Sequence, residues 1–173
     1  MKLNIVLFEP EIPTNTGNIM RTCKATDSNL HLIEPLGFSM DQSSLKRAGL
    51  DYLKDFSYKL YDNWQHFAGK NQGNFIYITR YGKKTPKEFN FKENDEDIYL
   101  IFGKETTGLP YKLLHENLDN CIRLPMIEKA RSLNLSNCVA IMTYHVLGEW
   151  DYLALSKKET IKGEDWIYKE RDD

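Results

Sequence analysis

Residues 98–108 read IYLIFGKETTG, in which five apolar residues (Ile98–Phe102) run directly into a loop with a glycine at either end (Gly103–Gly108). An apolar run without polar alternation is typical of a strand that helices cover on both faces of a parallel sheet. The segment FIYIT at Phe75–Thr79 has the same character. Because ligands in open α/β sheets bind beyond the carboxyl ends of the strands, the loop at 103–108 is a candidate ligand site.

Strand-like runs alternate with helical patterns on both sides of this segment. Strands are expected at Leu3–Phe8, Leu30–Glu34, Phe56–Leu60, Phe75–Thr79, Ile98–Phe102 and Cys121–Leu124. Helices are expected at Gly17–Asp27, at Ser43–Leu50, from Trp64 to Ala68 behind an N-cap at Asp62, from Pro110 to Asn117, and from about Asn134 to Leu153. The alternation predicts a three-layer α/β fold with a mostly parallel sheet. One domain is expected over residues 1–155, followed by a charged, aromatic tail over residues 156–173.

The composition is that of an ordinary globular protein, with 41% hydrophobic and 28% charged residues. No apolar run approaches the length needed to cross a bilayer, so no membrane association is expected. The three cysteines are far apart and form neither a disulfide framework nor a metal-ligand spacing. These features predict a cytoplasmic protein that needs no metal.

The formal net charge of −2 does not by itself point to nucleic-acid binding. Basic residues nevertheless gather in three places, which are Lys46–Arg47, then Arg80, Lys83, Lys84 and Lys87, then Arg123, Lys129 and Arg131. Any one group is most simply a solvated surface. An RNA-binding surface requires several of them to share one face, which the sequence leaves open.

The last expected helix has little polar surface. Its apolar residues form a stripe and then extend around the cylinder, and they are Val139, Met142 and Val146, with Ala140, Ile141, Tyr144 and Leu147. A surface helix usually keeps a wide polar face. Two interpretations remain open: a helix in the centre of its own domain, or a helix whose second face is covered by the partner in a dimer.

Two further loops have unusual compositions. In Glu9–Arg21, prolines stiffen the chain and Arg21 follows one helical turn after Gly17. A cation near a helix N-terminus opposes the macrodipole, so Arg21 is either a surface residue or a contact for an anion or ribose phosphate. The segment Leu124–Asn137 carries more small polar residues than one N-cap requires, and the surplus serves either a ligand or a solvated loop.

The loop at 103–108 lacks the features of a phosphate site. It has no Gly-Lys-Ser/Thr ending, and the first helix has no dinucleotide-binding fingerprint. A glutamate between two glycines, Glu105, suits a neutral or cationic ligand better than a phosphate.

Three segments, NIVLFEPEIPTNTGNIMR (4–21), FGKETTGLP (102–110) and RLPMIEKARSLNLSN (123–137), together resemble the three motifs of the SPOUT methyltransferases, in the same order. The similarity is greatest to the small tRNA 2′-O-methyltransferases that modify the wobble nucleotide, and it extends to about Trp150. Lys104 and Thr107 depart from the pattern, because relatives often carry Pro and Arg there.

This resemblance implies a SPOUT fold with a deep C-terminal trefoil knot, and a homodimer with the active site at the subunit interface. It implies S-adenosylmethionine as cofactor, with S-adenosylhomocysteine as product. The implied reaction is 2′-O-methylation of cytidine or uridine 34 in tRNA, in leucine isoacceptors. The alternatives are a 2′-O-methyltransferase for another tRNA or rRNA position, and an inactive RNA-binding protein of the same fold.

The resemblance also implies roles for individual residues. The catalytic set is Arg21, Asn15, Ser132 and Asn134. The cofactor-binding set is Ile78, Gly103, Glu105, Gly108, Leu124, Met126, Ser132 and Leu133. The RNA-binding set is Arg21, Lys46, Arg47, Lys83, Lys84 and Arg131. Because a guanidinium stays protonated in proteins, we expect Arg21 to orient the ribose hydroxyl and stabilise developing negative charge rather than act as a base.

Overall fold

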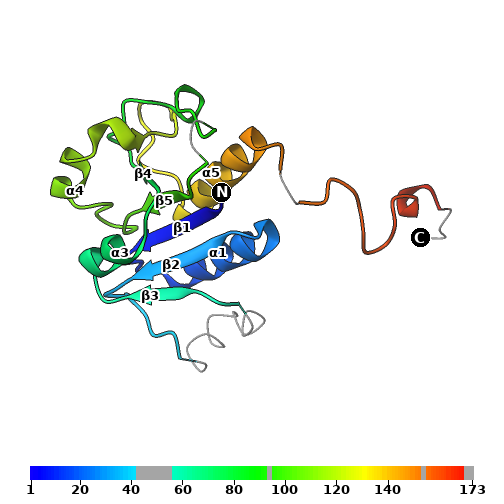
Figure 1. The fold of residues 1–173 in the computed structure, drawn as a ribbon, viewed down its shortest axis with the longest axis horizontal. Helices are drawn as coiled ribbons and strands as arrows, with labels where there is room; N and C mark the ends of the chain where they lie inside the picture. Colours follow the sequence, from blue (N-terminus) through cyan, green and yellow to red (C-terminus); the bar gives the residue numbers. More distant parts are fainter. Residues whose placement is uncertain (42–55, 93–94, 153–154, 170–173) are drawn as a thin grey trace.

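The computed structural model describes residues 1–41, 56–92, 95–152 and 155–169 (Figure 1). Its centre is a six-stranded sheet in the order β3-β2-β1-β5-β4-β6. The strands are β1 (Leu3–Phe8), β2 (Asn29–Ile33), β3 (Lys59–Tyr61), β4 (Asn74–Ile78), β5 (Ile98–Phe102) and β6 (Cys121–Ile122). Every neighbouring pair is parallel. The predicted parallel sheet is therefore confirmed.

The central strands are buried on both faces. All six residues of β1 and all five of β5 are buried. Alternate residues of β1 belong to different core clusters: Ile5 packs with one helix layer and Val6 with the other. Helices α1 (Pro13–Thr26) and α5 (Leu135–Glu149) contribute to the first cluster, and α3 (Trp64–Lys70) and α4 (Tyr111–His115) to the second. The three-layer α/β prediction is confirmed.

Several predicted boundaries are wrong, each for a local reason. Helix α1 begins at Pro13, four residues before Gly17, because a proline fits the first helical turn. The N-cap of α3 is Asn63 rather than Asp62, since the Asn63 side chain accepts a 2.9 Å hydrogen bond from the His66 amide. Pro110 is the N-cap of α4, which ends at His115.

Other segments are shorter than predicted. Strand β3 starts only at Lys59, where β2 begins to pair with it. Strand β6 ends at Ile122. Helix α5 ends at Glu149 because Asp151 and Tyr152 adopt left-handed backbone angles. The helix expected at Ser43–Leu50 lies outside the described residues.

Helix α5 has one buried and one exposed side. Val139, Met142 and Val146 are fully buried against the sheet, whereas Ile141 is 47% exposed and Tyr144 is 50% exposed. The interpretation of α5 as the centre of its own domain is therefore wrong. After α5 the chain runs away from the sheet to a short helical turn at Trp166–Tyr168 (Figure 1). Within the described ranges, no helix combines the length and apolar character needed to span a membrane.

Candidate active site at the carboxyl ends of the strands

A cavity of about 600 Å³ lies beyond the carboxyl ends of β4, β5 and β6. It is bounded by the loops that follow these strands and by the first residues of α1 and α5. All eight residues expected to bind a cofactor line it: Ile78, Gly103, Glu105, Gly108, Leu124, Met126, Ser132 and Leu133. Asn15, Arg131 and Asn134 line it too. The loops singled out from the sequence thus meet at one place.

The loop after β5 folds back tightly on itself. A Cβ added to Gly103 would lie 2.2 Å from the carbonyl carbon of Gly108, which is far closer than real atoms approach. Gly108 has a φ of 73°, and its amide donates a 3.0 Å hydrogen bond to the carbonyl of Lys104. Both glycines are required by this geometry, since one allows a close approach and the other a left-handed angle.

The carboxylate of Glu105 is committed within the protein. One oxygen accepts from the Glu11 amide at 2.9 Å, and the other accepts from the Ile12 amide at 3.2 Å and the Asn15 side chain at 3.0 Å. Ile12 is the N-cap of α1 and cannot cap the helix with its own side chain. Glu105 therefore caps α1 from a distant loop, where a negative charge also favours the helix macrodipole. The sequence interpretation missed this structural role.

Asn15 connects Glu105 to the start of α5. Its side-chain oxygen accepts a 2.9 Å hydrogen bond from the side chain of Asn134. The Asn134 oxygen in turn accepts from the amide and hydroxyl of Ser136, at 2.9 and 2.7 Å, and so caps α5. We call Glu105, Asn15 and Asn134 the amide relay. It joins all three sequence motifs through side chains alone.

A second set of contacts fastens the first two motifs together. The Thr106 amide and hydroxyl donate to the Glu11 carboxylate at 3.1 and 2.7 Å. Lys104 forms an ion pair with Glu9, and this hydrogen bond raises the pKa of Lys104. Lys104, one of the two departures from the family pattern, thus has a local partner that a proline could not supply.

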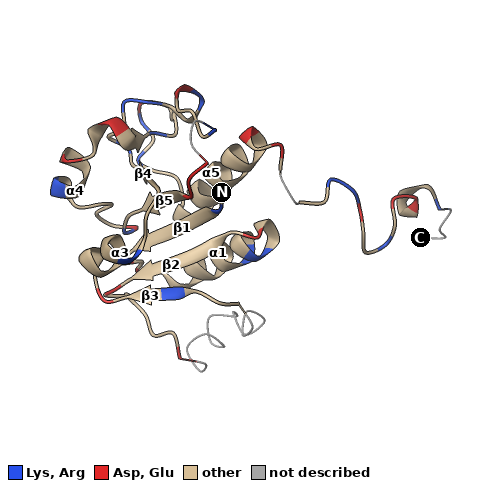
Figure 2. Cartoon of the chain, in the orientation of Figure 1, with Lys and Arg blue, Asp and Glu red and all other residues tan. Residues whose placement is uncertain are grey.

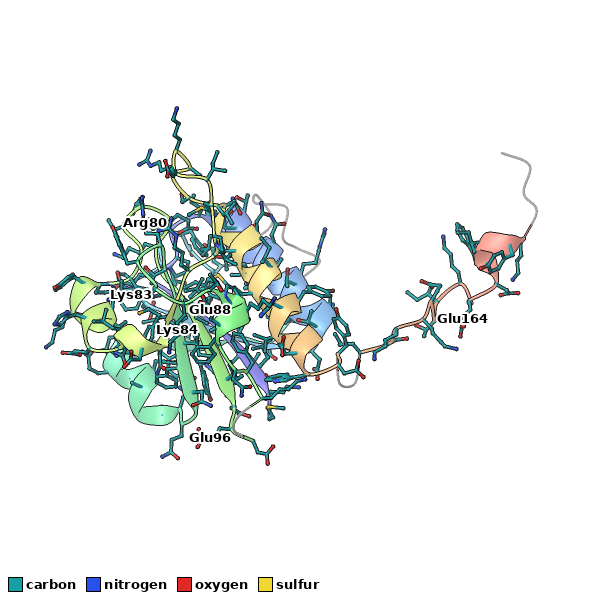
Figure 3. The ribbon with its side chains drawn as sticks, turned by 90° about the horizontal axis from the view of Figure 1, so that it is seen from above. Arg80, Lys83, Lys84, Glu88, Glu96 and Glu164 are labelled. Carbon is teal, nitrogen blue, oxygen red and sulfur yellow. The ribbon has the colours of Figure 1, made fainter. Side chains whose placement is uncertain are left out.

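The predicted RNA-binding residues are dispersed. Arg21 is exposed on α1 and does not line the cavity of its own chain. Figure 2 shows that Lys and Arg residues are spread over several elements of the chain. Lys83 and Lys84 lie with Arg80 on one side of the molecule (Figure 3). Lys84 donates a 2.8 Å hydrogen bond to the carbonyl of Asp119. Lys46 and Arg47 lie outside the described residues.

Sequence reasoning missed Thr79, Arg80 and Tyr81, which also line the cavity. A signal was available, because these residues follow a strand directly, as Gly103 follows β5. The rule that ligands bind beyond the carboxyl ends of strands applies to them equally.

The cavity suits a nucleoside-sized cofactor. Its volume lies within the range of roughly 300–1,000 Å³ that is usual for small-molecule sites. Leu124, Met126 and Leu133 provide apolar surface, and the close-packed loop at 103–108 brings backbone groups to the wall. Glu105 is the one acidic residue in the lining, and its carboxylate is hydrogen-bonded to amides at the start of α1. Arg80 and Arg131 therefore make the rim of the cavity positively charged. In the part of the chain that the structure describes, no three His, Cys, Asp or Glu side chains gather into a metal site.

Comparison with known proteins agrees with this geometry. Residues 2–144 match the SpoU rRNA Methylase family. A Geobacillus stearothermophilus protein named "Putative tRNA (cytidine(34)-2'-O)-methyltransferase" is 52% identical over 90% of this chain and 100% of its own length. A solved structure described as "Structural insights into the 2-OH methylation of C/U34 on tRNA" has a TM-score of 0.77 and 35% identity, over 87% of this chain and 97% of that one.

A more distant structure shares the fold. It is an AdoMet-bound rRNA methyltransferase from Sinorhizobium meliloti, with a TM-score of 0.71 and 23% identity over 85% of this chain and 56% of that one. The resemblance read from the three sequence motifs is confirmed by the family match, which spans most of the chain and includes all three. The chain belongs to the SpoU rRNA Methylase family of methyltransferases.

Proposed function

We propose that this protein is an S-adenosylmethionine-dependent tRNA methyltransferase that modifies the 2′-hydroxyl of nucleotide 34, a cytidine or uridine, in leucine tRNAs. The observation that carries the proposal is the convergence of three motifs on one cavity through the amide relay. The named activity of the Geobacillus relative and the subject of the C/U34 structure support the choice of substrate.

The cofactor is proposed to lie against Ile78, the loop at 103–108, Leu124, Met126 and the turn at 132–133, all of which line the cavity. When bound, S-adenosylmethionine supplies an electrophilic methyl group and leaves as S-adenosylhomocysteine. The apolar walls exclude water from that methyl group, and the backbone of the loop reads the nucleoside. Ser132 is exposed at the cavity and is free to face the RNA.

Arg21 of the same chain does not line the cavity, so a role for Arg21 in the reaction requires a second subunit. We propose a homodimer in which Arg21 of the partner subunit reaches the ribose. The exposed Ile141 and Tyr144 on α5, with Leu133 at the cavity rim, are apolar surface suited to such an interface. The guanidinium orients the 2′-hydroxyl and stabilises the negative charge that develops as its proton passes to solvent water.

Three further features belong to the proposal. Residues 1–155 form the methyltransferase domain and residues 156–173 a tail outside it. The segment from β6 to α5 is threaded into a trefoil knot, as the family resemblance implies. A tRNA substrate would place the enzyme in the cytoplasm.

The test is a methylation assay on purified total tRNA and on rRNA, with radiolabelled S-adenosylmethionine and mapping of 2′-O-methyl groups. We expect one new methyl group at position 34 of leucine tRNAs. A tRNA with a 2′-deoxyribose at that position should accept none. Methyl transfer to rRNA alone would replace the tRNA proposal with its alternative, and binding without transfer to any RNA would indicate an inactive relative.

A further inference from the structure

Tyr81 is a large aromatic side chain held at the mouth of the cavity. It follows β4 by three residues, lines the cavity and is 71% exposed. It belongs to neither core cluster. Packing within this chain therefore does not account for an aromatic residue at this position.

The segment that carries Tyr81 is anchored on both sides of it. The Thr79 amide donates to the Ile122 carbonyl at 2.9 Å, and Arg123 donates to the carbonyls of Arg80 and Lys84, each at 2.8 Å. A Cβ added to the next residue, Gly82, would lie 2.5 Å from the backbone of Ile122. The backbone at 79–84 is thus pressed against the end of β6, and this fixes the position from which Tyr81 projects.

One cation lies beside this aromatic ring, and two more follow it in the chain. The guanidinium carbon of Arg80 lies 5.8 Å from the centre of the Tyr81 ring. Lys83 and Lys84 follow, and Figure 3 shows them on the same side of the molecule as Arg80. Residues 79–87 contain no acid. The nearest one along the chain, Glu88, is engaged by the amide and hydroxyl of Thr85 at 2.8 and 2.7 Å.

An exposed aromatic ring with a guanidinium beside it, in a basic segment without acids, matches the chemistry of single-stranded RNA. Unpaired bases stack on aromatic side chains, and the flanking phosphates pair with Arg and Lys. We propose that Tyr81 is a stacking platform for the nucleobase next to the ribose that is methylated, with Arg80 and Lys83 on the adjoining phosphates. This inference rests on the proposed function and deepens it, because it assigns a residue that selects an unpaired loop over a duplex.

The experiment compares wild type with Tyr81→Ala and Tyr81→Phe, and uses Tyr168→Ala as a control at another highly exposed tyrosine, in the tail. The probes are anticodon stem-loop RNAs with 2-aminopurine at the 5′ or 3′ neighbour of nucleotide 34. Binding of the wild-type protein should quench the fluorescence of one probe, because stacking on an aromatic ring quenches 2-aminopurine. Tyr81→Ala should lose the quenching and weaken RNA binding about tenfold, whereas Tyr81→Phe and Tyr168→Ala should keep both. Affinity for S-adenosylmethionine without RNA should be unchanged in all four proteins.

Three results would overturn the inference while leaving the proposed function intact. They are unchanged RNA binding and quenching in Tyr81→Ala, a loss of S-adenosylmethionine affinity without RNA, and a change in oligomeric state. The second would place Tyr81 on the cofactor and the third would place it in a subunit interface. If wild type neither binds nor methylates the stem-loop, the proposed function itself fails and this inference with it.

Discussion

The side chain of Asn134 donates a 2.9 Å hydrogen bond to the side-chain oxygen of Asn15, 119 positions earlier in the chain. The same Asn15 donates to Glu105, so one amide side chain holds two loops in register. Both the oxygen and the amide nitrogen of the Asn15 side chain are hydrogen-bonded to other side chains of the protein. This arrangement favours Asn15 as a residue that positions the site over one that contacts the transferred methyl group.

The amide relay should contribute measurably to stability. Asn15 is 6% exposed, and Asn15→Ala would remove the acceptor of the Asn134 amide group and one of the three donors to the Glu105 carboxylate. We expect the free energy of unfolding to fall by about 1–3 kcal/mol, measured by urea denaturation. Asn18→Ala, at an exposed position one turn along α1, should change it by less than about 0.5 kcal/mol. Equal effects of the two substitutions would show that the relay is energetically unimportant.

The tight loop at 103–108 should not tolerate a side chain at its first residue. In Gly103→Ala the new Cβ meets the backbone of Gly108, which must shift. We expect a loss of about 1–3 kcal/mol in stability and weaker S-adenosylmethionine binding in calorimetry, because the displaced loop forms a cavity wall.

Gly69→Ala is the matched control for this substitution. Nothing lies within 4 Å of a Cβ added there, in helix α3, so it should be neutral or stabilising by up to about 1 kcal/mol. Normal cofactor binding by Gly103→Ala would mean that the loop does not contact the cofactor.

Stability should depend on pH through His31. Burial, with a smaller contribution from Lys59, lowers the pKa of His31 to about 4 from the ordinary value of 6.5. Its Nε2 donates to the Asn4 oxygen at 3.2 Å and its Nδ1 accepts from the Tyr61 hydroxyl at 2.9 Å, so both nitrogens are satisfied in the neutral ring.

The direction of the pH dependence follows from whether the folded or the unfolded state binds a proton at His31 first as the pH falls. Below pH 6.5 the unfolded chain is protonated at His31, whereas the folded protein resists protonation until about pH 4. The stabilisation is therefore complete above pH 6.5 and lost as the pH falls towards 4, up to about 3 kcal/mol. Urea denaturation of wild type and His31→Gln between pH 7.5 and 4 checks this. Parallel stability curves for the two proteins would contradict it.

Arg21 should affect turnover more than binding. Lysine keeps the charge but not the planar fork of the guanidinium, so Arg21→Lys should lower the single-turnover rate about a hundredfold or more while S-adenosylmethionine affinity is kept. Lys24→Ala, at another exposed cation on α1, is the control and should be nearly fully active. Near-normal turnover by Arg21→Lys would exclude a specific guanidinium role.

Mixed subunits test whether Arg21 acts across an interface. Arg21→Ala and Gly103→Ala impair different halves of the proposed site. If each active site combines Arg21 of one subunit with the cofactor loop of the other, hybrid dimers should be more active than either variant alone. A mixture no more active than its components would place Arg21 and the cofactor in the same chain.

The amino-acid sequence by itself determined the strands β1, β4 and β5, because an apolar run without polar alternation is typical of a strand covered by helices on both faces of a parallel sheet. It also indicated an N-cap among the small polar residues at 132–137 and revealed the three motifs, and the structure identifies Asn134 as the cap. Tertiary structure alone decided that Glu105 caps α1, that Tyr81 lies at the cavity mouth and that α5 exposes Ile141. Each of these depends on which strands become neighbours in the sheet, and that order is set by long-range packing, which local residue patterns do not encode.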